Sequence, residues 1–321
     1  MDDCLLYVGT DTRCHAYELR DGKATKVGTG LDGNAVRQIS VHPDDPREAL
    51  VACGLRGWGL HRTRNAGESW ESLGYEESWV WGVERDPTDP DTVYVGTEPP
   101  MLYRSRDGGE SFESFDAISD LPSSDQWTFF HEPFEAGHVH GIAIDPENPD
   151  RVFAGVEHGG FVFTYDGGET WDDSLAGYDV HDTAVVPGTD RVLVAAGEGL
   201  LVSDDAGEEF DRIVGFEDDY VEQFLEVGDR IYVDATAGSG SADATIAYTD
   251  DGGDSWHRFE GVPDVSVTGC NLLAAHGDTL FHARDEDGES EVVATDDGGD
   301  TWIPVGPSHG KIRAIAAAPL P

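Results

Sequence analysis

The sequence is poor in positive charge, and above all in lysine. Of 321 residues only 20 are Lys or Arg, against 65 Asp or Glu, so the formal net charge at pH 7 is −45. The lysines are Lys23, Lys26 and Lys311. A chain this acidic excludes nucleic-acid recognition through phosphate contacts, because such binding needs clustered Lys and Arg.

Long apolar runs are missing as well, and cysteine is sparse. No run reaches the roughly 20 residues of a membrane span, and the opening MDDCLLYVG has no basic or apolar leader. Cys4, Cys14, Cys53 and Cys270 lack metal-ligand spacing. We therefore expect a cytoplasmic monomer without membrane partners and with buried thiols, while a Cys4–Cys14 pair across a hairpin stays open.

Aromatic residues, in contrast, are plentiful. The chain has 8 Trp, 13 Phe and 10 Tyr spread along its length, which a disordered acidic protein would lack. An acidic folded surface stays hydrated where salt screens charge repulsion, and the screening length falls to about 3 Å at 1 M salt. The composition therefore predicts a folded, halophilic protein of haloarchaeal type.

One eight-residue pattern recurs along the chain: Ser or Thr, any residue, Asp, any, Gly, any, Ser or Thr, aromatic. The copies begin 42, 59, 39, 46 and 46 residues apart, a spacing typical of propeller blades. The six copies occupy residues 63–70, 105–112, 164–171, 203–210, 249–256 and 295–302.

The pattern is suited to a tight hairpin. The Asp side chain can accept hydrogen bonds from backbone N–H groups further along the turn, and glycine supplies the positive φ that the turn needs. The aromatic residue then packs between neighbouring sheets. We expect these Asp residues to be structural.

This repeat resembles the Asp box, or BNR repeat, of sialidases, sortilin-type receptors and photosystem II assembly-factor-like propellers. The resemblance implies an all-β β-propeller, with the boxes on the face opposite any active site. The six repeats mark six blades, and the termini supply a seventh: residues 5–27 are expected to form second, third and fourth strands, and residues 313–319 the missing inner strand. We predict a single domain over residues 1–321. Its first blade joins residues 1–30 to 308–321, so both termini close the ring, and an insertion covers 116–137. The other blades are predicted at 34–72, 77–115, 138–174, 179–213, 220–260 and 268–304.

The resemblance also allows equivalent inner-strand positions to be aligned at the mouth of the central channel. All seven are polar, ionisable or aromatic, although a structural role alone predicts a mixture of small and apolar residues. We therefore predict a ligand site there. The aligned residues are Arg37, Trp81, His140, His181, Glu222, Asn271 and Arg313.

Loops between second and third strands should add further side chains to this upper face. Those expected to bind ligand are Arg56 and Glu98, together with Trp127 from the insertion, which packs either against the third blade or over a ligand. Other loop residues expected there are Asp11, Trp58, Glu157, His158, Glu198, His282 and Arg284.

Histidines concentrate in the fourth and fifth predicted blades. His138 and His140 lie two apart on a predicted strand, which puts both imidazoles on one side. With His158 and His181 they form a candidate site for a divalent metal ion, the only cofactor the sequence suggests. The alternative is that these imidazoles bond to neighbouring carboxylates. If the protein is an enzyme, His140, His181, Glu157 and Glu222 are the candidate catalytic residues.

Three functions remain open. The first is a small-molecule-binding propeller with a His/Glu/Arg upper site, for an anionic or metal-chelated ligand, with metal-assisted hydrolase or lyase chemistry as its enzymatic form. The second is a sialidase-like glycoside hydrolase, in which Arg37, Arg56, Arg284 and Arg313 would cluster and Tyr220–Glu222 would be the nucleophile pair. Here Arg37 stands in Val-Arg-Gln-Ile-Ser, which departs from the Arg-Ile-Pro signature of that family. The third is a non-enzymatic scaffold for a protein partner.

Overall fold

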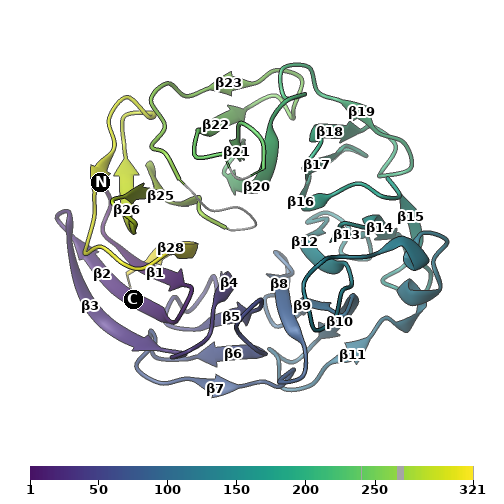
Figure 1. Cartoon of the computed structure of the whole chain (residues 1–321), viewed down its shortest axis with the longest axis horizontal. Coiled ribbons are helices and arrows are strands. Elements are labelled where there is room, and N and C mark those ends of the chain that lie inside the picture. The colour runs from purple at the N-terminus through teal and green to yellow at the C-terminus, as the bar shows by residue number, and fades with distance from the viewer. Residues whose placement is uncertain (240, 266–270, 321) are drawn as a thin grey trace.

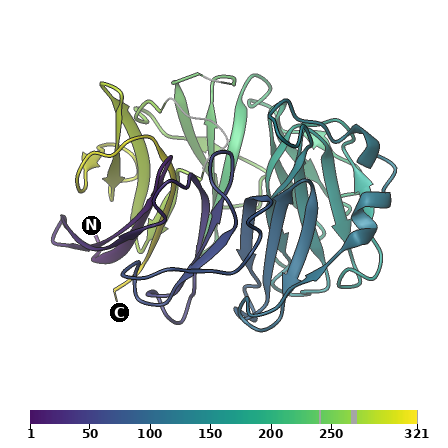
Figure 2. The ribbon, with the colours of Figure 1, turned by 60° about the horizontal axis from the view of Figure 1, so that its bottom comes forward.

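Seven four-stranded antiparallel sheets surround a central axis in this computed structural model (Figure 1). The structure describes residues 1–239, 241–265 and 271–320. In the turned view the sheets appear as twisted blades that stand side by side around the ring (Figure 2). The predicted seven-bladed β-propeller is therefore confirmed.

Each blade runs from an inner strand beside the axis to an outer strand, which is short in every blade except the one that holds both termini. The blades in ring order are β28 (Ile312–Pro319), β1 (Cys4–Thr10), β2 (Cys14–Arg20), β3 (Lys23–Gly30); β4 (Val36–Val41), β5 (Ala49–Cys53), β6 (Leu60–Thr63), β7 (Glu71–Ser72); β8 (Trp79–Arg85), β9 (Val93–Glu98), β10 (Met101–Ser105), β11 (Glu113–Ser114); β12 (His138–Ile144), β13 (Val152–Glu157), β14 (Gly160–Thr164), β15 (Asp172–Ser174); β16 (Val180–Val185), β17 (Val192–Ala196), β18 (Gly199–Ser203), β19 (Asp211–Arg212); β20 (Tyr220–Val227), β21 (Arg230–Thr236), β22 (Ala244–Thr249), β23 (His257–Arg258); β24 (Ala274–His276), β25 (Thr279–Glu286), β26 (Glu289–Thr295), β27 (Ile303–Pro304).

The two ends of the chain close the ring in one blade. β28 pairs antiparallel with β1, from Cys4 opposite Pro319 to Thr10 opposite Ile312. The C-terminal strand thus supplies the inner strand that the first blade lacks, and the closure leaves no open edge between first and last blades. This is the predicted closure.

The six repeats form hairpin turns between third and fourth strands, each with the same two hydrogen bonds. In the second turn the N–H of Ser111 donates to Asp107 Oδ1 at 2.9 Å, and the N–H of Gly109 donates to Ser105 Oγ at 2.8 Å. The other turns repeat this geometry within 0.2 Å. The conserved spacing of the pattern therefore serves the turn.

Arginines link one blade to the repeat turn of the next. Guanidinium groups donate to glycine carbonyls, from Arg62 to Gly108 at 2.9 Å and from Arg104 to Gly167 at 2.8 Å. Both arginines are almost fully buried. Two of the 20 Lys and Arg residues of the chain therefore serve to join neighbouring blades.

Polar side chains also link neighbouring inner strands, which share no sheet. Gln38 on β4 accepts from the Val83 N–H on β8, and Asp182 on β16 accepts from the Phe224 N–H on β20, at 2.9 and 2.7 Å. Gln223 exchanges two hydrogen bonds with the backbone of Leu273, both at 2.9 Å. These bonds satisfy inner-strand backbone groups that have no strand partner on the channel side.

The insertion between the third and fourth blades contains two short 3-10 helices, η1 (Asp116–Asp120) and η2 (Ser124–Gln126). Ile118, on η1, is fully buried in the cluster that joins these blades. In the described part of the chain, no helix is long and apolar enough to cross a membrane.

The described cysteines are free and buried, as predicted. Cys4 lies opposite Leu19 across the first hairpin, while Cys14 lies opposite Gly9, so the suggested Cys4–Cys14 pairing is wrong. Burial raises the pKa of the Cys4 and Cys53 thiols to about 12. Cys270, like residues 268 and 269 of the seventh predicted blade, lies outside the described residues.

Candidate functional site at the upper face

We define the upper face as the end of the ring where inner strands begin and second strands end; the repeat turns lie at the opposite, lower end. Near the upper end each of several inner strands has an irregularity that leaves one residue out of the β-ladder. Such bulges redirect side chains and are common beside active sites. The residues left out are Arg37, Trp81, His181, Glu222 and Arg313.

These five are residues that the sequence alignment singled out. In the fourth blade the alignment is off by one position, because the residue left out of the ladder is Gly141 and not His140. Gly141 has a φ of 55°, and a Cβ there would lie 2.4 Å from the Cα of Asp182. The bulge therefore needs glycine, and His140 stays paired with Gly155 just before it.

His138 stands between two glutamates. Its Nε2 lies 2.7 Å from Glu157 Oε2, and its Nδ1 lies 3.6 Å from Glu98 Oε2. The Trp81 indole stacks on the imidazole, with ring centroids 3.7 Å apart, and donates to Glu98 at 3.0 Å. His138 and Glu98 are fully buried. This packing fixes both carboxylates relative to one ring.

The two glutamates have opposite electrostatic environments. Burial raises the pKa of Glu98 to about 8, although its hydrogen bond from Trp81 opposes the change. Burial would also raise the pKa of Glu157, but the charge and hydrogen bond of His138, with His181 and His140 nearby, outweigh it and hold that pKa well below its usual range. Near neutral pH, Glu98 therefore holds a proton for part of the time and Glu157 is ionised.

A second histidine–carboxylate pair lies in the fifth blade. His181 Nε2 is 3.2 Å from Asp179 Oδ2, and its Nδ1–H donates to the Val221 carbonyl at 2.6 Å. Burial alone would lower the pKa of His181, but Asp179 and the charges of Glu222 and Glu157 raise it to about 10. The imidazole is thus a buried cation at neutral pH.

Tyr220 belongs to this pair and not to the one expected from the sequence. Its hydroxyl donates to Asp179 Oδ2 at 3.0 Å, so the proposed Tyr220–Glu222 nucleophile pair finds no support in the geometry. Burial, with the charges of Glu222 and Asp179, raises the pKa of Tyr220 well above its usual range. A nucleophilic tyrosine would need the opposite shift.

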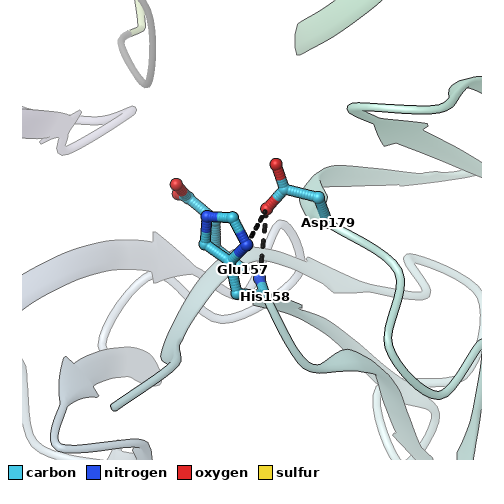
Figure 3. A group of neighbouring side chains, drawn as sticks. All are labelled: Glu157, His158 and Asp179. Atoms are coloured by element: carbon cyan, nitrogen blue, oxygen red, sulfur yellow. Dashed lines mark hydrogen bonds and ion pairs between the residues drawn. The ribbon is translucent and has the colours of Figure 1, made fainter. Parts of the chain in front are cut away.

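Glu157, His158 and Asp179 come together on the upper face. One potential ligand atom from each lies within 4.8 Å of the other two, and Figure 3 shows the His158 ring between the two carboxylates. His158 Nδ1 lies 3.6 Å from Asp179 Oδ1, which also accepts from the His158 backbone N–H at 3.1 Å. His158 has a φ of 56°, which places this residue in the tight turn after β13.

The four histidines predicted to bind metal therefore have different positions in the site. His158 lies among the converging donors, whereas His138 and His181 each contact one carboxylate of the group, Glu157 and Asp179 respectively. Asp179 was not among the residues predicted from the sequence. The only sequence signal for it is its place two residues before His181, on the segment that leads into β16.

His140 is buried beside these residues but makes a different contribution. Its Nδ1 has no hydrogen-bond partner in the part of the chain that the structure describes. Burial lowers its pKa to about 3, even though the charge of Glu157 opposes this shift. A neutral imidazole with a free nitrogen next to carboxylates is suited to receive a ligand or an ion.

Trp127 of the insertion is buried. Its ring is buried with Val156 and Trp171 in the cluster between the third and fourth blades, and its indole N–H donates to Ser123 at 2.9 Å. Of the two alternatives the sequence left open, packing is the one the structure shows. The neighbouring Phe129 and Phe130 instead extend toward His158, with ring centroids 4.8 and 6.3 Å away.

The arginines of the expected sialidase-like cluster contact different partners. Arg313 contacts Asp11 at 2.5 Å, and Arg284 donates to Glu291 at 3.0 Å. Arg37 lies over the Trp81 ring, 4.7 Å from its centroid, and donates to the Gly54 carbonyl at 3.0 Å. Arg56 is exposed on a turn with a φ of 84°.

Asn271 has a structural role. It bridges to Ala314 and donates to the carbonyl of Arg37 at 3.1 Å, linking the seventh blade to the second. It also borders a cavity of about 400 Å³ in the lower part of the central channel, to which the other predicted ligand-binding residues do not contribute.

Comparisons with known proteins agree with this architecture. No family model matches the chain. The oligoxyloglucan-reducing end-specific xyloglucanase of Emericella nidulans is 24% identical over 208 residues, which are 57% of this chain and 24% of that protein. The chain thus spans about a quarter of the length of the curated relative it matches.

Two solved structures resemble the propeller itself. The GH74 xyloglucanase from Xanthomonas campestris has a TM-score of 0.61 at 18% identity, covering 85% of this chain and 45% of that one. YCF48 bound to D1 peptide has a TM-score of 0.54 at 16% identity, covering 85% and 82%. At these identities the likeness shows the β-propeller fold, shared by glycoside hydrolases and by YCF48.

Proposed function

We propose that the protein binds a divalent metal ion at Glu157, His158 and Asp179 and, through it, a small anionic ligand. The observation that supports this most directly is the convergence of three donor atoms within 4.8 Å. One imidazole and two carboxylates suit Zn²⁺ or Mn²⁺, and three protein donors leave coordination positions for a ligand.

The residues around the three donors fit such an ion. Carboxylates that bind metal are usually held by hydrogen bonds from a surrounding layer of side chains. His138 holds Glu157 at 2.7 Å, while Tyr220 donates to Asp179 at 3.0 Å. The unpartnered Nδ1 of His140 adds a neutral nitrogen nearby.

Positively charged side chains near the insertion favour an anionic ligand. The positive charges of Arg37 and Arg56 both help to lower the pKa of His131, after burial, so both lie near the insertion that borders the metal donors. A bound divalent ion polarises the ligand that completes its coordination. If the protein is an enzyme, the proposed ion would serve a hydrolase or lyase reaction.

The test is metal binding by protein purified without a metal-chelating tag. We expect one Zn²⁺ or Mn²⁺ per chain by elemental analysis and by calorimetric titration in molar KCl. Asp179→Asn and His158→Gln should abolish this binding, while the exposed Asp250→Asn should bind normally. Sub-stoichiometric metal that the site variants leave unchanged would overturn the proposal.

A second candidate is glycoside hydrolysis, favoured by Glu98 and Glu157. Paired carboxylates whose pKa values are pushed apart are typical of an acid and a base in glycosidases. The two contact opposite nitrogens of His138, and the pKa of Glu98 is raised to about 8 while that of Glu157 is lowered. Xyloglucan hydrolysis lost in both Glu98→Gln and Glu157→Gln would support it; no hydrolysis by the parent protein would end it.

A scaffold role predicts a different result from either activity. A partner protein captured equally well by the parent and by Asp179→Asn would place the function outside the upper-face donors. The same measurement in the Asp250→Asn control shows whether a single lost carboxylate changes capture nonspecifically.

A further inference from the structure

The insertion lines one side of the metal donors with aromatic rings. The Phe129 ring lies 4.8 Å from that of His158 and 4.5 Å from that of His131. The Phe130 ring lies 4.7 Å from Phe129 and 4.4 Å from His131. We call Phe129, Phe130 and His131 the aromatic wall; it begins in direct contact with a donor of the proposed metal site.

Phe130 is far more exposed than packing requires. Its side chain is 75% exposed, and its ring adjoins the partly buried ring of Phe129. Trp127, in the same insertion, is 5% exposed and anchors the segment in the core. Trp127 therefore anchors the insertion in the core, while Phe130 presents an exposed aromatic surface beside His158.

The chemistry of the wall indicates what it can contact. Phenylalanine rings offer no conventional hydrogen bonds, so the polar groups of a ligand gain nothing from them. Flat rings, in contrast, gain from offset or edge-to-face contact at centroid separations of about 4.5–7 Å. Phe129 and Phe130, inclined at 45° to each other, present both a face and an edge.

We propose that the ligand is a small aromatic carboxylate, whose carboxylate completes the coordination of the metal ion while its ring packs on Phe129 and Phe130. This rests on the proposed function, because the ion holds the carboxylate. The wall selects the ring, and the ion selects the acid group.

Two α-hydroxy acids that differ mainly in a phenyl ring test this directly: mandelate and lactate. Calorimetric titration of the metal-loaded protein should show mandelate binding about tenfold tighter, the upper value for an aromatic contact. Phe130→Ala should bring the two affinities together by weakening mandelate alone. Val214→Ala, which alters another exposed apolar side chain, should preserve the difference.

The outcomes separate the two proposals. Metal binding with equal affinities for mandelate and lactate, or with tighter binding of a sugar acid such as glucuronate, would overturn the aromatic ligand and leave the metal site standing. Failure to bind metal would overturn both. A dimer that dissociates in Phe130→Ala, measured by light scattering, would assign the wall to a second copy of the chain and also reject the proposal.

Discussion

The imidazole Nε2 of His138 lies 2.7 Å from Glu157 Oε2, and both side chains are almost fully buried at the upper end of the fourth blade. Truncating one member of a buried hydrogen-bonded pair leaves the other without its partner. The pair therefore connects the stability of the blade to the position of a proposed metal donor.

His138→Ala should lower the free energy of unfolding by about 3 kcal/mol, because it strands the Glu157 carboxylate and removes the stack on Trp81. It should also weaken metal binding about 10- to 100-fold, the usual cost of losing a group that orients a ligand. Urea unfolding and calorimetry measure the two effects. Glu157→Gln separates them: it should lose metal binding with a smaller loss of stability.

His181 should make the protein less stable at alkaline pH. Its pKa in the folded state is about 10, above the ordinary value of about 6.5. The stabilisation from its contact with Asp179 is therefore fully present below pH 6.5 and is lost as the pH rises through 10. Denaturant unfolding between pH 6.5 and 10 should show a decline on the order of 2–4 kcal/mol, which should be clearly smaller in His181→Gln. An equal decline in that variant would contradict this account.

Glu84, which lines the cavity in the channel, should cause a second loss of stability as the pH rises, in a lower pH range than that of His181. Burial raises its pKa to about 8, although the Arg85 backbone N–H opposes this. Because the folded state favours the protonated form, stability is greatest below the ordinary value of about 4.3 and falls as the pH rises through 8. Glu84→Gln should remove this part of the decline. A pH profile in that variant identical to that of the parent would show that Glu84 does not titrate in this range.

The fold could be predicted from the sequence because the repeat is local. Each turn is closed by residues within eight positions, such as Ser105, Asp107 and Ser111, so the pattern and its period reveal the hairpin and the blade. The closure by β28 followed from strand order alone. The clustering of histidines likewise pointed to the fourth and fifth blades.

The arrangement within the site could not be predicted in this way, because it depends on contacts between blades. Asp179 is one of 65 acidic residues, and only the folded ring brings its carboxylate to His158 and Tyr220. The bulge in β12 falls at Gly141 because Asp182 of the next blade approaches there. Such close contacts leave no periodic signal in one sequence.

The repeat turns should tolerate Asn but not Ala in place of Asp. The first turn carries Asn65 naturally, and its Oδ1 accepts from the Ser69 N–H at 2.9 Å, as Asp107 does for Ser111. Asp107→Asn should therefore keep the melting temperature close to that of the parent, whereas Asp107→Ala should lower it. Thermal unfolding at pH 7 decides. A drop of equal size in both variants would show that charge, and not the oxygen acceptor, holds the turn.

The charge of −45 should make stability depend strongly on salt. Self-repulsion among exposed carboxylates destabilises the compact state, and the screening length shrinks from about 10 Å at 0.1 M to about 3 Å at 1 M salt. The melting temperature, followed by circular dichroism, should therefore rise from dilute buffer to molar KCl.

Neutralising one acidic stretch provides the control for this prediction. Glu208→Gln, Glu209→Gln and Asp211→Asn together remove three exposed charges from the fifth blade, so this triple variant should melt higher than the parent in dilute buffer and gain less from KCl. Salt can also strengthen apolar burial, which would raise both proteins equally. Parallel curves for parent and variant would therefore assign the salt effect to burial, and only converging curves support a halophilic surface.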